Sequence, residues 1–226
     1  MPEDEFSWEK FKAMPLVGIM RNINPAHTEH ILKAFYASGL TTVELTMNSP
    51  GFEKSLELGL SLFKGKLNIG AGTVCTKSDL DRALKYGAQF IVTPIVDEDV
   101  IKTCRARGIP VFPGAYTPTE IYTAWKLGAD MVKVFPATAQ AIEYIRAVKG
   151  PFPAIRLLPT GGIHSGNCID FMKAGATGLG IGSSLFNASV IKEGYNKLEE
   201  HFSVFVEQIR SYFIASDELS IRKRQI

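Results

Sequence analysis

The chain has 226 residues, 46% of them hydrophobic and 21% charged, and its formal net charge is +2. The near-neutral charge argues against nucleic acid as a partner, because proteins that bind polyanions usually carry a clustered basic surplus. Three widely spaced cysteines predict neither a disulfide framework nor a thiolate metal site. The acidic N-terminus and the lack of a long apolar run predict a cytoplasmic protein without a membrane segment.

Short apolar runs typical of buried strands recur along the chain at intervals of roughly 20 to 26 residues, which is the period of a strand, a loop, a helix and a loop. The runs are Leu16–Met20, Thr41–Leu45, Leu67–Ala71, Gln89–Val92, Pro110–Phe112, Asp130–Val134, Ile155–Leu158 and Gly178–Ile181.

Helix-like segments lie between these runs, and several end on a glycine, as in Ala83–Gly87 and Phe171–Gly175. Eight strand–helix units predict an α/β protein with the (β/α)8 TIM barrel fold, formed by residues 1–226 as a single domain with a core at about 10–212. The alternative is an open doubly wound sheet. It is disfavoured because no glycine-rich dinucleotide loop follows the first run.

The two ends of the chain are expected to differ from the repeat. Phe6–Lys12 predicts a short N-terminal helix that closes the bottom of the barrel. Residues 217–226 predict a frayed tail, and the basic cluster Arg222–Arg224 within it reads as solvated, since terminal segments that are not tied down fray.

Two charged residues interrupt apolar strands. Strand alternation places Glu44 opposite Val43 and Leu45, and it separates Lys133 from its apolar neighbours in the same way, so both charged side chains are predicted to point into the barrel. An inert buried ion pair is the alternative, but desolvation makes such pairs poor stabilisers. Three further polar residues are predicted at the same end of other strands, where barrel enzymes carry their active sites: Arg21, Thr73 and Thr160.

The two buried charges suggest a chemistry. Burial among apolar side chains disfavours the ammonium form of a lysine, and a free amine attacks a ketone to form an imine that can act as an electron sink. Breaking a neighbouring carbon–carbon bond then requires a group that moves protons. Lys133 is therefore the candidate nucleophile, and Glu44 is the candidate acid and base.

Two glycine-rich segments, Thr160–Ile163 and Gly180–Ser184, follow the last two predicted strands. Glycines let backbone N–H groups approach an anion, and a helix N-terminus beside them would add a favourable dipole. In a (β/α)8 barrel these two loops are the usual phosphate site. The segments predict phosphate binding, with plain tight turns as the alternative. The histidines predict no metal site.

Motifs throughout the chain resemble the 2-keto-3-deoxy-6-phosphogluconate (KDPG) aldolase family, also called the 4-hydroxy-2-oxoglutarate (KHG) aldolase family. They run in family order from about residue 10 to 190. The motifs are Gly18–Arg21, Val43–Thr46, Ile69–Val74, Gly87–Pro94, Thr117–Glu120, Val132–Pro136, Lys149–Pro153 and Pro159–Ile163.

The resemblance implies a homotrimeric class I aldolase without cofactor or metal that cleaves KDPG reversibly to pyruvate and glyceraldehyde 3-phosphate. It implies that Lys133 forms the Schiff base and that Glu44 shuttles protons. The other roles that it implies are Arg21 and Thr73 at the substrate carboxylate, Phe135 and Pro94 as walls of the pyruvyl pocket, Thr160 near the substrate hydroxyls, and Gly161, Gly162, Gly182 and Ser183 at the phosphate.

The sequence departs from the family pattern in two places. Asn48–Pro50 stands where some members carry a carboxylate-binding arginine, and it resembles the branch that acts on the galactonate epimer, 2-keto-3-deoxy-6-phosphogalactonate. Ala141–Ile142 replaces a Gly-Pro pair, and this change is expected to narrow the mouth or shift the following helix. The galactonate epimer and 4-hydroxy-2-oxoglutarate are therefore alternative substrates. A catalytically silent barrel that binds a sugar phosphate is a further alternative.

Overall fold

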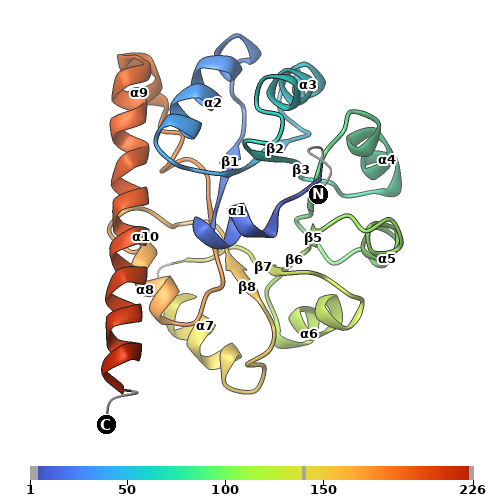
Figure 1. The fold of residues 1–226 in the computed structure, drawn as a ribbon. Helices are drawn as coiled ribbons and strands as arrows, with labels where there is room; N and C mark the ends of the chain where they lie inside the picture. Colours follow the sequence, from blue (N-terminus) through green and yellow to red (C-terminus); the bar gives the residue numbers. More distant parts are fainter. Residues whose placement is uncertain (1–4, 139–140, 224–226) are drawn as a thin grey trace.

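A computed structural model describes residues 5–138 and 141–223 of the chain. Strands and helices alternate over most of this length (Figure 1). The strands are β1 (Leu16–Met20), β2 (Thr42–Thr46), β3 (Asn68–Gly72), β4 (Ile91–Val92), β5 (Val111–Phe112), β6 (Gly114–Ala115), β7 (Val132–Val134), β8 (Leu157–Pro159) and β9 (Leu179–Ile181). The helices between β1 and the C-terminal segment are η1 (Pro25–His27), α2 (Thr28–Ala37), α3 (Phe52–Leu62), α4 (Lys77–Lys85), α5 (Glu98–Ala106), α6 (Pro118–Lys126), α7 (Ala141–Lys149) and α8 (Cys168–Lys173).

The strands form two parallel sheets. One has six strands in the order β5-β4-β3-β2-β1-β9, and the other has three in the order β6-β7-β8. The chain passes from the first sheet to the second through Pro113, which separates β5 from β6, and a parallel bridge from Thr160 to Gly180 links the end of β8 to β9. Each predicted apolar run contains or overlaps a strand. Only β6 was not expected.

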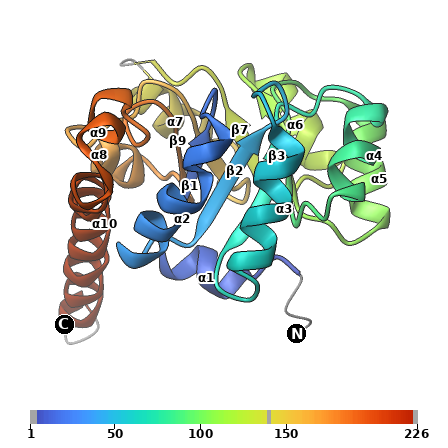
Figure 2. The same cartoon turned by 90° about the horizontal axis from the view of Figure 1, so that it is seen from above.

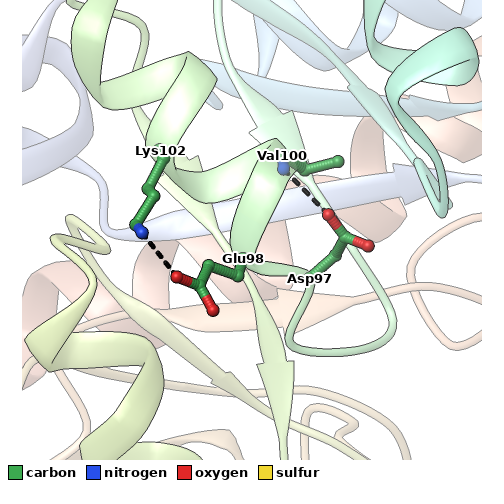
Figure 3. Close-up of polar contacts among 4 residues, drawn as sticks. All are labelled: Asp97, Glu98, Val100 and Lys102. Atoms are coloured by element: carbon green, nitrogen blue, oxygen red, sulfur yellow. Dashed lines mark hydrogen bonds and ion pairs between the residues drawn. The ribbon is translucent and has the colours of Figure 1, made fainter.

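The outer helices bury one face of the strands. Val43 and Leu45 of β2 and Val132 and Val134 of β7 belong to one large hydrophobic cluster together with residues of the surrounding helices. Several helices begin at side-chain caps, among them α4, α5 and α6. At α5, for example, Asp97 Oδ1 accepts a hydrogen bond of 2.8 Å from the Val100 N–H (Figure 3). An exposed ion pair of 2.5 Å joins Glu98 and Lys102 on the same helix and adds little stability.

A second, smaller cluster fills the opposite face of the strands, and we call it the interior cluster. It consists of Phe6, Phe11, Val17, Phe90, Val92, Phe112, Met131 and Leu158. The predicted N-terminal helix is present as α1 (Trp8–Ala13), and it contributes Phe11 to this cluster. In Figures 1 and 2 α1 lies across one end of the strands. Asn68 of β3 fixes this end of the chain by bonding both the N–H and the carbonyl of Ser7.

The chain ends in α9 (Ala188–Glu193) and the long helix α10 (Tyr195–Lys223). Figures 1 and 2 show α10 along one side of the molecule, where it contacts α2, α8 and α9. The backbone is helical through Lys223, whereas fraying was expected from about residue 217; residues 224–226 of that tail lie outside the described part. This stretch has no glycine or proline to interrupt the helix. None of the helices in the described residues combines the length and the hydropathy of a membrane-spanning segment.

Candidate active site

Glu44 and Lys133 lie in the middle of β2 and β7, and both are buried, with 1% and 4% of their surface exposed. Lys133 lies two residues after Met131, so the two side chains point to the same face of the strand, and Met131 belongs to the interior cluster. Glu44 lies opposite Val43 and Leu45, which pack against the outer helices. The two charged side chains therefore share the inner face of the strands, as the alternation predicted.

Glu44 is held as a buried carboxyl group with incomplete hydrogen bonding. Burial raises its pKa above the ordinary value, although the nearby charges of Lys133 and Arg21 pull the pKa down in part. Its Oε1 atom has no hydrogen-bond partner among the described residues. A carboxyl group in this state is suited to exchanging a proton with a substrate rather than to stabilising the fold.

Gly72 makes room for this carboxyl group, and sequence reasoning missed its importance. A Cβ atom on residue 72 would lie 1.6 Å from Glu44 Oε1 and 2.2 Å from Glu44 Cδ. Gly72 ends β3, and its partner across the ladder is Thr46 of β2, so the Glu44 side chain extends along β2 toward it. The Gly-Ala-Gly pattern of residues 70–72 was the available signal, since small residues at alternate strand positions mark a close approach.

Arg21 and Thr73 follow β1 and β3, and they meet at the end of these strands. Arg21 Nη2 donates a hydrogen bond of 3.3 Å to Thr73 Oγ1. Thr73 has a backbone φ of +61°, an unfavourable conformation for a β-branched residue. A strained backbone at such a place is typical of functional sites.

Ser49, in the loop after β2, braces the segment that carries Arg21. Its Oγ accepts a hydrogen bond of 2.8 Å from the Asn22 N–H, and it lies 2.7 Å from the hydroxyl of Thr46. The sequence pointed to the Asn48–Pro50 segment only as a departure from the family pattern. Asn48 itself is exposed.

The surroundings of Lys133 include both residues that were expected to wall the pocket. Lys133 Nζ lies 5.3 Å from the centre of the Phe135 ring, which is 42% exposed. Lys133 pairs with Gly114 across the ladder. A Cβ atom on Gly114 would lie 2.5 Å from the backbone of Pro94, so Pro94 is packed against the strand beside Lys133.

The segment after β8 approaches the same region. Thr160 is buried, and its hydroxyl fills the space beside Gly180. A Cβ atom on Gly180 would lie 2.1 Å from Thr160 Oγ1. Gly161 and Gly162 have φ angles of +98° and +69°. A Cβ atom on Gly161 would lie 3.7 Å from the Phe135 ring, so this glycine neighbours the same aromatic side chain as Lys133.

The segment after β9 forms a turn rather than the start of a helix. The Gly182 carbonyl accepts hydrogen bonds from the N–H groups of Leu185 and Phe186, and Ser183 is exposed within this turn. The helices α8 and α9 begin several residues beyond the two glycine segments, so the helix N-termini expected directly beside these glycines are absent there. Turns of this kind still present backbone N–H groups to an anion.

The second departure from the family pattern lies away from the inner face of the strands. Ala141 is the first residue of α7, is 1% exposed and belongs to the large hydrophobic cluster. Its methyl group therefore packs in the core, which argues against a narrowed mouth. The described part of the chain contains no group of three or more His, Cys, Asp or Glu residues that could hold a metal ion.

The chain is similar to known proteins over most of its length. The family model for KDPG and KHG aldolases matches residues 8–200. A 2-dehydro-3-deoxy-6-phosphogalactonate aldolase of Escherichia coli (strain K12) is 33% identical over 198 residues, which cover 87% of this chain and 95% of that protein.

Two solved structures extend the comparison. A structure described as native KDPGal has a TM-score of 0.84 at 31% identity, covering 92% of this chain and 98% of the other. A KDPG aldolase from Legionella pneumophila, with pyruvate captured at low pH as a covalent carbinolamine intermediate, has a TM-score of 0.78 at 26% identity and covers 91% and 98%. The match over most of the chain shows that this protein belongs to the KDPG and KHG aldolase family and is an aldolase, a carbon–carbon lyase.

Proposed function

We propose that the protein is a class I aldolase that cleaves KDPG to pyruvate and glyceraldehyde 3-phosphate through a Schiff base on Lys133. The observation that carries this proposal is the pairing of a buried lysine and a buried carboxyl group of raised pKa on the inner face of the strands. The covalent pyruvate intermediate described for the Legionella enzyme supports the same route.

The reaction begins when Lys133 Nζ attacks the C2 carbonyl to give a carbinolamine, which loses water to form a protonated imine. The C4 hydroxyl then gives its proton to the Glu44 carboxylate. As the C3–C4 bond breaks, its electrons move into the imine to leave an enamine, and the aldehyde departs. Glu44 returns the proton to C3, and water hydrolyses the resulting pyruvyl imine to pyruvate and free lysine.

The remaining site residues are assigned to the two ends of the substrate. Arg21 and Thr73 would hold the carboxylate, and their hydrogen bond already brings them together. Pro94 and Phe135 would enclose the pyruvyl group, and Thr160 would approach the hydroxyls. The phosphate would lie against Gly161, Gly162, Gly182 and Ser183, in two glycine-rich segments that the Ser184–Ile163 hydrogen bond joins.

Borohydride reduction in the presence of pyruvate, followed by peptide mass mapping, tests this proposal. We expect an adduct on Lys133 and none in Lys133→Met. Lys149 is a suitable internal control, because burial lowers the pKa of its amine, yet it lies on α7 with Nζ bonded to the carbonyls of Pro153 and Ile155. An adduct on Lys149 alone, or none with the protein folded, would refute the assignment.

The galactonate epimer is a second candidate substrate. It is favoured by the Escherichia coli relative, by the KDPGal structure and by the Asn48–Pro50 segment. Values of kcat/KM for KDPG, for this epimer and for 4-hydroxy-2-oxoglutarate would separate the candidates. A binding protein without turnover is the remaining alternative, and it would be favoured if ligand binding were the only measurable property and survived Lys133→Ala.

We also propose that the two sheets form one closed (β/α)8 barrel and that the protein is a cytoplasmic homotrimer. The Thr160–Gly180 bridge and the short step across Pro113 support closure, because each joins an edge of one sheet to the other. The trimer follows from the family resemblance, and a monomer in light scattering would contradict it.

A further inference from the structure

A side-chain hydrogen bond links helix α10 to the turn that follows β9. His201 Nε2 lies 2.7 Å from the carbonyl oxygen of Ser184. A carbonyl oxygen can only accept a hydrogen bond, so this ring nitrogen carries the hydrogen and donates it. The bond ties α10 to the turn that contains Gly182 and Ser183.

The same turn is tied to the other glycine segment. Ser184 Oγ donates a hydrogen bond to the carbonyl of Ile163, which directly follows Gly161 and Gly162. His201, Ser184 and Ile163 therefore connect α10 with both segments assigned to the phosphate.

Aromatic packing holds the donor and the turn in place. The rings of His201 and Phe205 pack edge to face at a centroid distance of 5.7 Å. The next residue, Phe202, packs edge to face on Phe186 at the end of the turn, at 5.5 Å. A donor with its ring fixed in this way restrains the turn at a small entropic cost.

We infer that His201 is a positioning residue for the phosphate end of the substrate, an inference that rests on the proposed function. The backbone N–H groups of two separate glycine-rich turns have to converge on one anion, and such turns are conformationally soft unless they are braced. His201 lies one residue beyond the segment matched by the family model, so this role is not part of the family assignment.

The test compares substrates with and without the phosphate. His201→Ala removes the donor, and His201→Gln keeps one. Ser184→Ala removes the hydroxyl that bonds Ile163. Ser203→Ala is a matched control, because the Ser203 hydroxyl donates its hydrogen bond to the Glu199 carbonyl within α10. For each protein we would measure KM and kcat for KDPG or its epimer, the inhibition constant of inorganic phosphate, and the pyruvate concentration that gives half-maximal borohydride trapping.

We expect His201→Ala to raise KM and the phosphate inhibition constant about fivefold or more, the effect of one lost hydrogen bond. The value of kcat should change by less than about twofold, and half-maximal trapping by pyruvate should not change. His201→Gln should restore most of the affinity, Ser184→Ala should raise the same KM, and Ser203→Ala should have no effect.

An unchanged KM in His201→Ala would overturn the inference. Equal losses toward pyruvate and the phosphorylated substrate would also overturn it, because they would indicate general destabilisation. Failure of the proposed function looks different, because the unaltered protein would then give no pyruvate adduct on Lys133.

Discussion

The carboxyl group of Glu44 occupies the space beside Gly72 that any side chain on residue 72 would need, since a Cβ atom there would lie 1.6 Å from Glu44 Oε1. The absence of a side chain on residue 72 of β3 therefore determines where the carboxyl group of Glu44, the proposed acid and base, lies on the neighbouring strand β2. Because the register pairs Gly72 with Thr46, the carboxyl group is directed toward the end of the strands where Arg21 and Thr73 meet.

Gly72→Ala is expected to lower turnover by about 100-fold or more, because the new methyl group must displace the Glu44 carboxyl group by more than an ångström. Gly150→Ala is the control. A methyl group on Gly150 would lie 3.3 Å from the Ala147 carbonyl oxygen, a tight contact that a shift of a few tenths of an ångström relieves, and the φ of Gly150 is not positive. Turnover within about twofold of the unaltered protein in Gly72→Ala would show that the position of Glu44 is not critical.

Glu44→Gln is expected to lower turnover by about 10²- to 10⁴-fold, the range typical of a lost general acid or base. The amide keeps the shape of the side chain but cannot exchange the proton. Borohydride trapping of pyruvate on Lys133 should remain detectable, so imine formation and carbon–carbon bond cleavage would be separated. Glu57→Gln, on the exposed surface of α3, is the matched control. Turnover close to normal would remove Glu44 from the proposed mechanism.

The raised pKa of Glu44 also predicts how stability depends on pH. A carboxyl group whose pKa is higher in the folded state binds its proton more tightly there, so it favours the fold at low pH. Its contribution to the free energy of unfolding falls as the pH rises from about 4.5, the ordinary pKa, through the raised value. Glu44→Gln has no carboxyl group to titrate at this position, so it does not lose this contribution to the free energy of unfolding as the pH rises.

We therefore expect the Tm of Glu44→Gln to exceed that of the unaltered protein near neutral pH, with the difference shrinking as the pH falls toward 4.5. Thermal unfolding over a pH series measures both proteins under identical buffers. A Tm difference that is independent of pH would show that the Glu44 pKa is not raised by folding.

The strand pattern was predictable because it depends on local alternation of apolar residues. Leu16–Met20 was predicted with the bounds that it has in the structure, and the inward direction of Glu44 and Lys133 followed from a period of two residues. The strand β6 was missed because Pro113 interrupts the apolar run, and proline is normally read as the end of a strand.

Other features depend on contacts between residues far apart in the sequence. The space that Gly72 leaves for Glu44 and the bond from His201 to Ser184 both require the fold before they can be seen. The preferred configuration at C4 of the substrate depends on a few atoms at the mouth of the proposed active site. The family motifs describe the imine chemistry, which all the candidate substrates share.

Thr73→Gly is expected to separate stability from affinity. Thr73 has a φ of +61°, a conformation that costs a residue other than glycine about 1–3 kcal/mol, and Thr73→Gly removes this cost. The greater entropy of glycine in the unfolded chain offsets about 0.5–1 kcal/mol of the resulting stabilisation. The Tm should therefore stay the same or rise. The variant also loses the hydroxyl that bonds Arg21, so more pyruvate should be needed for half-maximal borohydride trapping.

Asn22→Gly serves as the control for Thr73→Gly. Its φ is +54°, but asparagine tolerates this conformation well, so the substitution relieves little strain and keeps the backbone bond to Ser49. A lower Tm in Thr73→Gly together with unchanged trapping by pyruvate would mean that Thr73 supports the loop rather than the substrate. A higher Tm with weaker trapping would show that backbone strain is retained at this position because the hydroxyl is needed there.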